Sequence, residues 1–270
     1  MPEETPSEDL EVLDPDLHVA SFFIPAGRRE DVLALMRLSV ELARVASQVK
    51  EPMIAQIRYA WWREQVAALF EGRTVASPVV QALDAVASRH ALPRAVFDAI
   101  IDAHGLECEP IPFSDMAQLE AHARETRGGL MRLMARVLGA DARADAACDA
   151  AGIASGAALH LRSFDYWRRH RRLRLPLKPL IAQGLNEEDV FAGVGLDAVG
   201  RVFDEVRGRI KVALGEVNRA RFPRAAMPAL ALATLARPAL SMGDTPTTVR
   251  VVSPAGRVAR LALANLLWRA

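Results

Sequence analysis

The basic segment LRSFDYWRRHRRLRLP, residues 161–176, has the clearest capacity for chemistry in this sequence. It contains six arginines and one histidine but a single carboxylate, Asp165, and three aromatic residues lie among these charges. Arginines are favoured near the C-terminal end of a helix, where they face the negative end of the helix dipole. A solvated helix end therefore explains some of the arginines, but it does not explain the aromatic residues between them, which leaves a binding site as the alternative.

A second group of polar residues is spaced by four, three and four positions. It comprises Arg37, Glu41, Arg44 and Gln48. This spacing places the four side chains on one face of a helix, opposite an apolar face. A solvated helix surface and a ligand-binding surface both remain open for this group.

The elements that must position these residues are helices almost throughout. Alanine, leucine, arginine and glutamate dominate from about residue 28, and only TTVRVVS, residues 247–253, has a strand-like pattern. The sequence predicts one all-α domain of roughly eight to ten helices over residues 17–270, preceded by a disordered acidic tail over residues 1–16. The helices are predicted at 28–49, 53–72, 77–91, 93–109, 114–139 with an interruption at Gly128–Gly129, 141–170, 186–193, 197–220, 223–240 and 255–270.

Composition and charge limit the function. Hydrophobic residues make up 51%, enough for a sizeable core. The formal net charge is only +1, so an overall positive surface potential that would attract nucleic acid is not expected. No uncharged apolar run reaches the length of a membrane span, and the acidic start is unlike a targeting peptide. Cys108 and Cys148 are expected to be buried reduced thiols. We expect a cytoplasmic protein, with peripheral contact at the inner membrane face left open through the apolar, arginine-bearing last helix.

Two segments resemble motifs of the squalene/phytoene synthase family. They are LALMRLSVELAR, residues 33–44, and the basic segment at 161–176. The residues that match the family pattern are Arg37, Arg162, Leu175 and Pro176. The resemblance implies the isoprenoid synthase fold, a single all-α helical bundle around a central cavity.

The same resemblance implies a departure in chemistry. Active members of the family hold Mg²⁺ with aspartates on two facing helices, and the ions draw off a prenyl diphosphate. Here the positions of those aspartates are occupied by Val40, Glu41, Arg44, Ser163 and Trp167. Asp165 lies about 200° around the helix from Ser163, so it does not take over that position. We therefore expect no catalytic residue and no metal site, with Mg²⁺ required only if residual synthase activity exists.

One branch of the family is more similar still and includes an assembly factor of mitochondrial complex I. The shared stretch reads ELARVASQVKEPMIAQIRYAWWREQV, residues 41–66. This branch also lacks the intact aspartate motifs, which implies a protein partner in a membrane respiratory complex rather than catalysis. The segment DAHGLECEP departs from the branch, because His104 and Glu107 replace an arginine and an aspartate.

Several residues are predicted to line the cavity. They are Arg37, Glu41, Arg44, Arg58, Trp62, His122, Arg162 and Asp165. Because Trp61 and Trp62 are adjacent, they must face different sides of their helix, with one in the core. His104, His122 and His160 are on separate helices and give no sign of a metal triad.

Three functions remain open. The first is a non-catalytic assembly factor for a respiratory NADH dehydrogenase (complex I)-like complex. The second is a protein that binds a prenyl diphosphate or other lipid, or keeps prenyltransferase activity, with Arg37, Arg44 and Arg162 holding the diphosphate. The third is a membrane-surface protein that uses the arginine run and the last helix. A deep, open, apolar cavity that ends at Arg37, Glu41 and Arg162 favours the second function, and a filled one favours the first.

Overall fold

The computed structural model describes residues 6–49, 51–73, 77–241, 243 and 245–267. The chain forms a bundle of α-helices with short 3₁₀ segments and one π-helical turn. No β-strand occurs in these residues, and the strand-like stretch at 247–253 is irregular. The all-α fold class predicted from the sequence is confirmed.

The helices follow one another with short connections. Their bounds are α1 Pro6–Leu13, α2 Pro15–Ser21, α3 Ala26–Gln48, α4 Pro52–Phe70, α5 Pro78–His90, α6 Arg94–Leu106, α7 Met116–Ala123, the π-helical turn η1 Arg124–Gly128, α8 Gly129–Val137, η2 Ala142–Ala144, α9 Asp145–Arg169, α10 Leu177–Ala182, α11 Glu187–Ala192, α12 Leu196–Arg219, η3 Arg224–Ala226, α13 Met227–Leu230, η4 Ala231–Leu240 and α14 Pro254–Leu267.

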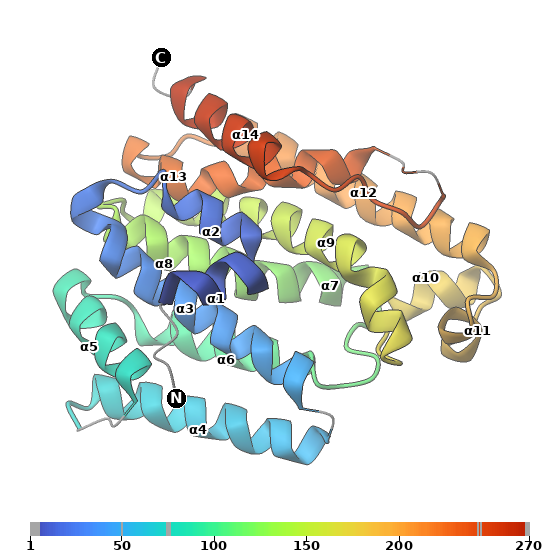
Figure 1. Cartoon of the computed structure of the whole chain (residues 1–270), viewed down its shortest axis with the longest axis horizontal. Coiled ribbons are helices and arrows are strands. Elements are labelled where there is room, and N and C mark those ends of the chain that lie inside the picture. Colours follow the sequence, from blue (N-terminus) through green and yellow to red (C-terminus); the bar gives the residue numbers. More distant parts are fainter. Residues whose placement is uncertain (1–5, 50, 74–76, 242, 244, 268–270) are drawn as a thin grey trace.

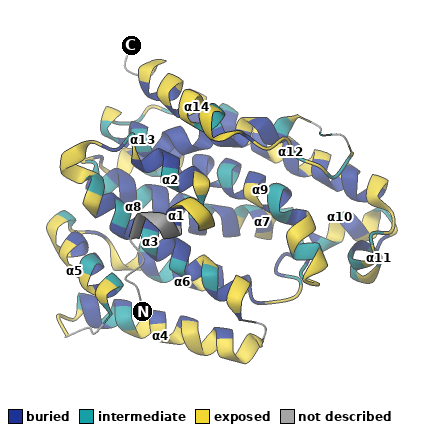
Figure 2. Cartoon of the chain, viewed as in Figure 1, coloured by how far each residue is buried: buried dark blue, intermediate teal, exposed yellow. Residues whose placement is uncertain are grey.

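Helix α9 runs through the middle of the bundle (Figure 1). It packs against α12, η4, α7, α8 and the π-helical turn, whereas α4 and α5 lie at the outer edge of the molecule. Burial follows the same arrangement, because α9 is largely buried and much of α4 is exposed (Figure 2). A helix surrounded on all sides must be rich in small and apolar residues, as the first half of α9 is.

Small residues of α9 permit a close approach to the π-helical turn. A Cβ atom at Gly152 would lie 2.2 Å from the backbone nitrogen of Gly128, and one at Gly156 would lie 2.7 Å from Cβ of Ala123. Neither space could hold a larger side chain. The predicted interruption at Gly128–Gly129 is therefore a π-helical turn that ends at Gly128 and packs directly on α9.

The N-terminal segment differs from the predicted acidic tail. Residues 1–5 lie outside the described part of the chain, whereas residues 6–13 and 15–16 are helical. Leu10 is only 1% exposed, and the Asp16 carboxylate accepts hydrogen bonds from Arg162 and Arg257 at 2.7 Å each. Two of the negative charges that suggested disorder, those of Asp14 and Asp16, are thus used in ion pairs with distant arginines. Helix α10 was also absent from the predicted elements.

The last helix, α14, packs on the bundle along one side only. Leu261 and Ala264 are buried against η4 and α2, whereas Leu263, Leu266 and Leu267 are more than half exposed. No helix in the described residues is both long and apolar enough to cross a membrane.

Candidate functional site

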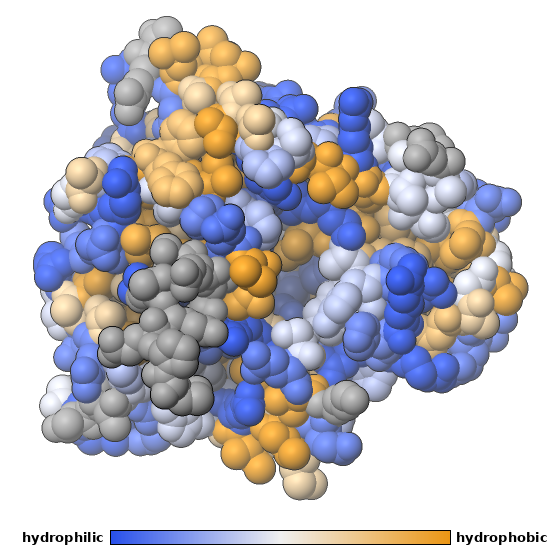
Figure 3. Space-filling model, viewed as in Figure 1, coloured by the Kyte–Doolittle hydropathy of each residue, from blue (hydrophilic) through white to orange (hydrophobic). Residues whose placement is uncertain are grey.

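A cavity of about 510 Å³ lies between α3 and the C-terminal half of α9. The end of α1, the end of α6 and the π-helical turn complete its wall. The space-filling view shows a hollow on this face, beside the N-terminal segment (Figure 3). We call it the central cavity.

Both motif segments contribute to the wall of the central cavity. Val40 and Arg44 line it from α3, and Ser163 and Trp167 line it from α9. The sequence predicted that these two helices face each other across a cavity, and the structure places them so. Of the five positions to which the family resemblance assigns metal-binding aspartates, Val40, Arg44, Ser163 and Trp167 line this cavity, whereas Glu41 lines a separate pocket.

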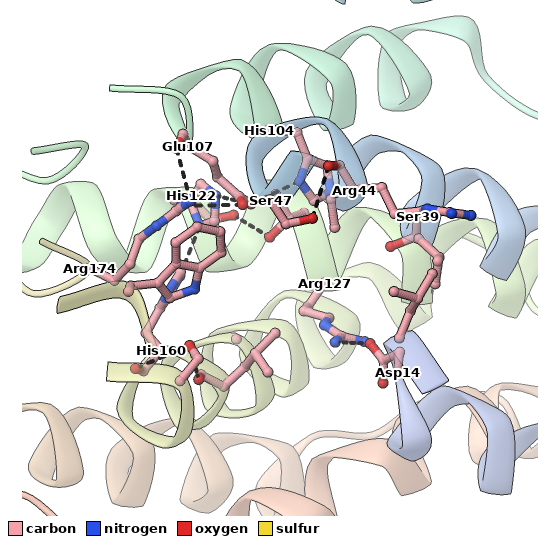
Figure 4. A pocket seen from close by; sticks show the side chains of 18 of the residues that line it. Asp14, Ser39, Arg44, Ser47, His104, Glu107, His122, Arg127, His160 and Arg174 are labelled. Atoms are coloured by element: carbon pink, nitrogen blue, oxygen red, sulfur yellow. Dashed lines mark hydrogen bonds and ion pairs between the residues drawn. The ribbon is translucent and has the colours of Figure 1, made fainter. Parts of the chain in front are cut away.

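A buried polar cluster forms one side of the cavity (Figure 4). At its centre, Oε1 of Glu107 lies 2.8 Å from Nδ1 of His104 and 3.0 Å from Nε2 of His122. The other carboxylate oxygen lies 3.2 Å from Nη1 of Arg174, and Nε2 of His160 lies 3.2 Å from Nδ1 of His122. Three histidines from three helices thus meet around one ion pair. We call these five residues the Glu107 cluster.

The ionisation of the Glu107 cluster follows from its burial and its partners. Burial raises the pKa of Glu107, but Arg174 and His104 lower it by more, so this pKa lies well below its usual 4.5. Burial lowers the pKa of His122, and Glu107 only partly opposes this. Burial, His122 and Arg174 hold the pKa of His160 well below 6.5. At neutral pH the cluster therefore contains one carboxylate, one guanidinium and neutral His122 and His160.

The Glu107 carboxylate determines which ring nitrogens of the neighbouring histidines carry protons. Since the Glu107 carboxylate only accepts, Nδ1 of His104 and Nε2 of His122 must carry protons. Nδ1 of His122 is then an acceptor, and Nε2 of His160 donates to it. Nε2 of His104 is buried and has no hydrogen-bond partner among the described residues.

The arginine run after α9 has a structural explanation. The chain turns at Arg171, whose φ of 54° is left-handed, and Leu173 N–H then donates to the Pro110 carbonyl at 2.8 Å. This turn directs Arg172 and Arg174 into the protein. Arg172 donates to the carbonyls of Ala46 and, at 2.8 Å, Val49, and so caps the C-terminal end of α3.

The second buried arginine, Arg174, is 1% exposed and stacks on Trp167, with its guanidinium carbon 4.3 Å from the ring centroid. It also donates to the Glu107 carbonyl at 2.8 Å. Other arginines of the run form surface ion pairs, Arg168 and Arg169 with Asp165 and Arg171 with Glu188. Much of this basic segment is therefore engaged with the protein itself.

Two of the eight predicted cavity residues, Arg44 and His122, line the central cavity. Three others, Glu41, Arg58 and Trp62, line a separate pocket of about 450 Å³ between α3, α4 and the start of α5. We call it the α4 pocket. Arg44 lines both, and its guanidinium lies 3.1 Å from the Glu41 carboxylate.

The remaining three lie outside the lining of both pockets. Arg162 points toward the N-terminal segment and donates to Asp16. Asp165 is exposed, and Arg37 is partly buried on α3. The arrangement that would favour the ligand-binding function, a cavity that ends at Arg37, Glu41 and Arg162 together, is not found among the described residues, because Arg162 lies on the side of α9 that packs toward α2 and η4.

The sequence did not single out Glu107 and Arg174 as partners. His104 and Glu107 are three residues apart, which places both on one face of a helix end, and this spacing is the signal that could have joined them. Cys108 and Cys148 are buried free thiols, as predicted. Trp62 is 6% exposed and Trp61 is 44% exposed, so one of the two is in the core, as predicted.

The donor set of the central cavity does not fit Mg²⁺. This ion needs several hard oxygen ligands in octahedral geometry. The carboxylates in the wall are Asp14 and Glu107, and each is paired with an arginine. No group of three His, Cys, Asp or Glu residues within the described ranges is placed to hold a metal ion.

The fold and the facing helices define an isoprenoid synthase-like protein, and comparison with known proteins agrees. The chain belongs to the squalene/phytoene synthase family, whose model matches residues 12–242. It is similar in structure to squalene synthase HpnC from Alicyclobacillus acidocaldarius, with a TM-score of 0.71 and 18% identity over 98% of this chain and 93% of that one. A dehydrosqualene synthase gives a TM-score of 0.76 with 14% identity, covering 98% of this chain and 95% of that one. These two likenesses establish the fold alone.

Curated relatives point to a particular branch. The chain is 30% identical over 183 residues to NADH dehydrogenase (ubiquinone) complex I, assembly factor 6 of Rattus norvegicus, which covers 67% of this chain and 55% of the relative. The protein of the same name from Homo sapiens is 29% identical over the same shares. The chain thus spans about half the length of the curated relatives it matches.

Proposed function

We propose that this protein is a non-catalytic member of the squalene/phytoene synthase family that helps to assemble a respiratory NADH dehydrogenase (complex I)-like complex. The observation that carries the proposal is the wall of the central cavity. Val40, Arg44, Ser163 and Trp167 line it at four of the five positions at which the family resemblance expects metal-binding carboxylates, and the fifth, Glu41, lines the separate α4 pocket. The similarity to complex I assembly factor 6 supports the branch, and the absence of a cofactor is part of the proposal.

Partner binding needs an accessible surface, and α4 offers one. Met53, Ile54, Ile57 and Trp61 are 73%, 49%, 62% and 44% exposed and follow helical spacing along one side of α4. We call this surface the α4 face, and apolar side chains gather there at the lower edge of Figure 3. The stretch that resembles the assembly-factor branch, residues 41–66, contains the whole of it.

The composition of the α4 face fits a protein subunit. Tryptophan, methionine and arginine are enriched at protein interfaces, and Arg58 stands beside the apolar side chains. The α4 pocket adjoins this face, since Ile57 and Trp61 line it, and it has room for an anchoring side chain from a partner. We propose that the subunit binds here, at the inner face of the membrane that holds the complex.

Deletion of the gene in its own host tests the assembly role. We expect loss of NADH:quinone oxidoreductase activity and accumulation of a partial complex on native gels, both restored by the wild-type gene. Ile57→Glu is expected to fail in complementation, because a charge on the α4 face disfavours apolar docking. The matched control is Val212→Glu, since Val212 is 53% exposed on α12, away from this face. An unchanged complex in the deletion strain would contradict the assembly role.

The non-catalytic part has its own test. Purified protein incubated with farnesyl diphosphate and Mg²⁺ is expected to give no condensation product, because the two carboxylates of the cavity wall, Asp14 and Glu107, are each paired with an arginine and form no set that could hold the ions. Formation of squalene or dehydrosqualene by the wild-type chain would overturn this part and leave the partner-binding test unaffected.

A further inference from the structure

Two charged side chains beside the α4 face have no partner within one copy of the chain. Glu51, which caps the start of α4, and Arg58 are both exposed. In the part of the chain that the structure describes, neither side chain forms an ion pair or a hydrogen bond. The other charged residues of α4, Arg63 and Glu64, are engaged in ion pairs. One unpaired charge of each sign therefore remains among the described residues of this helix and its cap.

The two charges lie on either side of exposed apolar residues. Glu51 and Arg58 are seven positions apart, which is about two turns and about 10 Å along a helix axis. Ile54 stands between them, and Trp61 follows one turn after Arg58. The four residues are spaced by three, four and three positions, which is the spacing of a seam between two packed helices.

This arrangement of charges is complementary to itself. A two-fold axis that passes between positions 54 and 55, perpendicular to α4, relates two antiparallel copies of the helix. It places Glu51 of each copy opposite Arg58 of the other and brings the two Ile54 side chains together at the axis. Such an isologous contact uses the same patch on both subunits.

The surroundings favour a second copy over other occupants. Helix α4 lies at the outer edge of the bundle (Figure 1), and Met53 and Ile57 beside the seam are 73% and 62% exposed. An anionic membrane surface would attract Arg58 but repel Glu51. A second copy satisfies both charges at once.

We propose that two copies of this chain associate through their α4 helices in antiparallel orientation, with two Glu51–Arg58 ion pairs around a centre of Ile54 and Ile57. The partner subunit is assigned to the same face, so the dimer covers that binding site and must separate before the subunit binds. This consequence for regulation rests on the proposed function, whereas the pairing of two copies does not.

Sedimentation velocity of the purified full chain measures the association directly. We expect a concentration-dependent dimer with a Kd of about 1–100 µM, because a seam of a few helical turns is at the small end of specific interfaces. A chain that stays monomeric well above this range would overturn the proposal.

Charge-reversed variants test the ion pairs. Arg58→Glu and Glu51→Arg each place like charges opposite each other and should each weaken the dimer about tenfold or more. The double variant Glu51→Arg/Arg58→Glu exchanges the two charges and should dimerise within about threefold of the wild-type chain. The matched control is Lys211→Glu, since Lys211 is exposed on α12 and should leave the Kd unchanged. A double variant that dimerises no more tightly than the single variants would overturn the pairing.

An introduced cysteine tests where the two-fold axis lies. Cys108 and Cys148 are buried, so Ile54→Cys adds one exposed thiol to the chain. Two such thiols at the axis come within reach of a disulfide, and mild oxidation should give a covalent dimer on a non-reducing gel. Val212→Cys on α12 is the control and should remain monomeric. Equal cross-linking of both variants would contradict the α4 contact.

The dimer and the assembly role can fail separately. A monomeric purified chain would leave the result in the deletion strain unchanged, and a normal complex in the deletion strain would leave the dimer in place. When two differently tagged copies are expressed together, we expect them to purify with each other from the free pool but not from the partial complex. A second copy within the partial complex would overturn the separation of the dimer on binding.

Discussion

The central cavity and the α4 face differ in which kinds of side chain are buried and which are exposed. Around the cavity, charged and polar side chains are buried and paired, with Glu107 8% exposed and Arg174 1% exposed. Along α4, apolar side chains are exposed. Buried ion pairs are costly to disturb, whereas exposed apolar residues contribute little to the free energy of unfolding and are available for association. Changes at the cavity should therefore alter stability first, and changes on the α4 face should alter partner binding first.

The largest effect is expected for Glu107→Gln. This change removes the carboxylate that faces Arg174 and leaves a buried guanidinium without its counter-charge. We expect a loss of about 3–5 kcal/mol in the free energy of unfolding, measured by urea denaturation. Glu109→Gln is the control, because Glu109 is exposed two residues away and should change this energy by less than about 0.5 kcal/mol. Equal losses in the free energy of unfolding for both variants would contradict the distinction between the buried, paired carboxylate and an exposed one.

The adjacent tryptophans compare a buried position with an exposed one within α4. Trp62→Ala is expected to cost about 3 kcal/mol or more, because it empties a buried site. Trp61→Ala should lower the free energy of unfolding by less than about 1 kcal/mol, since Trp61 is 44% exposed. When an affinity-tagged form of this protein is purified from its host, Trp61→Ala should nevertheless reduce the amount of partner subunit that is recovered with it. A stable Trp61→Ala protein that retains full partner binding would argue against the α4 face.

The free energy of unfolding should fall when the pH is lowered, because buried histidines of the Glu107 cluster bind protons less readily than they do in the unfolded chain. The pKa of His160 lies well below 6.5 in the folded protein, so below pH 6.5 the unfolded chain binds protons that the folded chain does not. The free energy of unfolding should be level above that pH and fall below it by about 1.4 kcal/mol per pH unit for such a group. His160→Gln should reduce the slope by about one proton. An unchanged slope in this variant would place the titration elsewhere.

The smallest effect is expected for Asp165→Asn. Asp165 is exposed and pairs only with neighbouring arginines of its own helix among the described contacts. We expect a change below about 0.5 kcal/mol in the free energy of unfolding, measured by urea denaturation. A loss above about 1 kcal/mol in this variant would show that Asp165 stabilises the fold by more than its two surface ion pairs.

Local pattern was enough to predict the helices from residue 26 onward with few exceptions, because amphipathic spacing and Pro and Gly signals act over a few residues. Helix α3 was predicted at 28–49 and runs over Ala26–Gln48. The segment before it was predicted to be disordered, because Asp14 and Asp16 gain partners only when Arg127, Arg162 and Arg257 are brought near by the fold.

The sequence by itself determined that this chain is all-α and that two of its helices carry motifs that resemble those of the family. Only the tertiary structure decided what those helices enclose. His104, His122 and His160 are up to 56 positions apart in the chain, and no local spacing predicts that they meet at Glu107. The reason is physical: burial and ion pairing are set by the packing of distant helices, and this packing turned a run of arginines into helix caps and the counter-charge of a buried carboxylate.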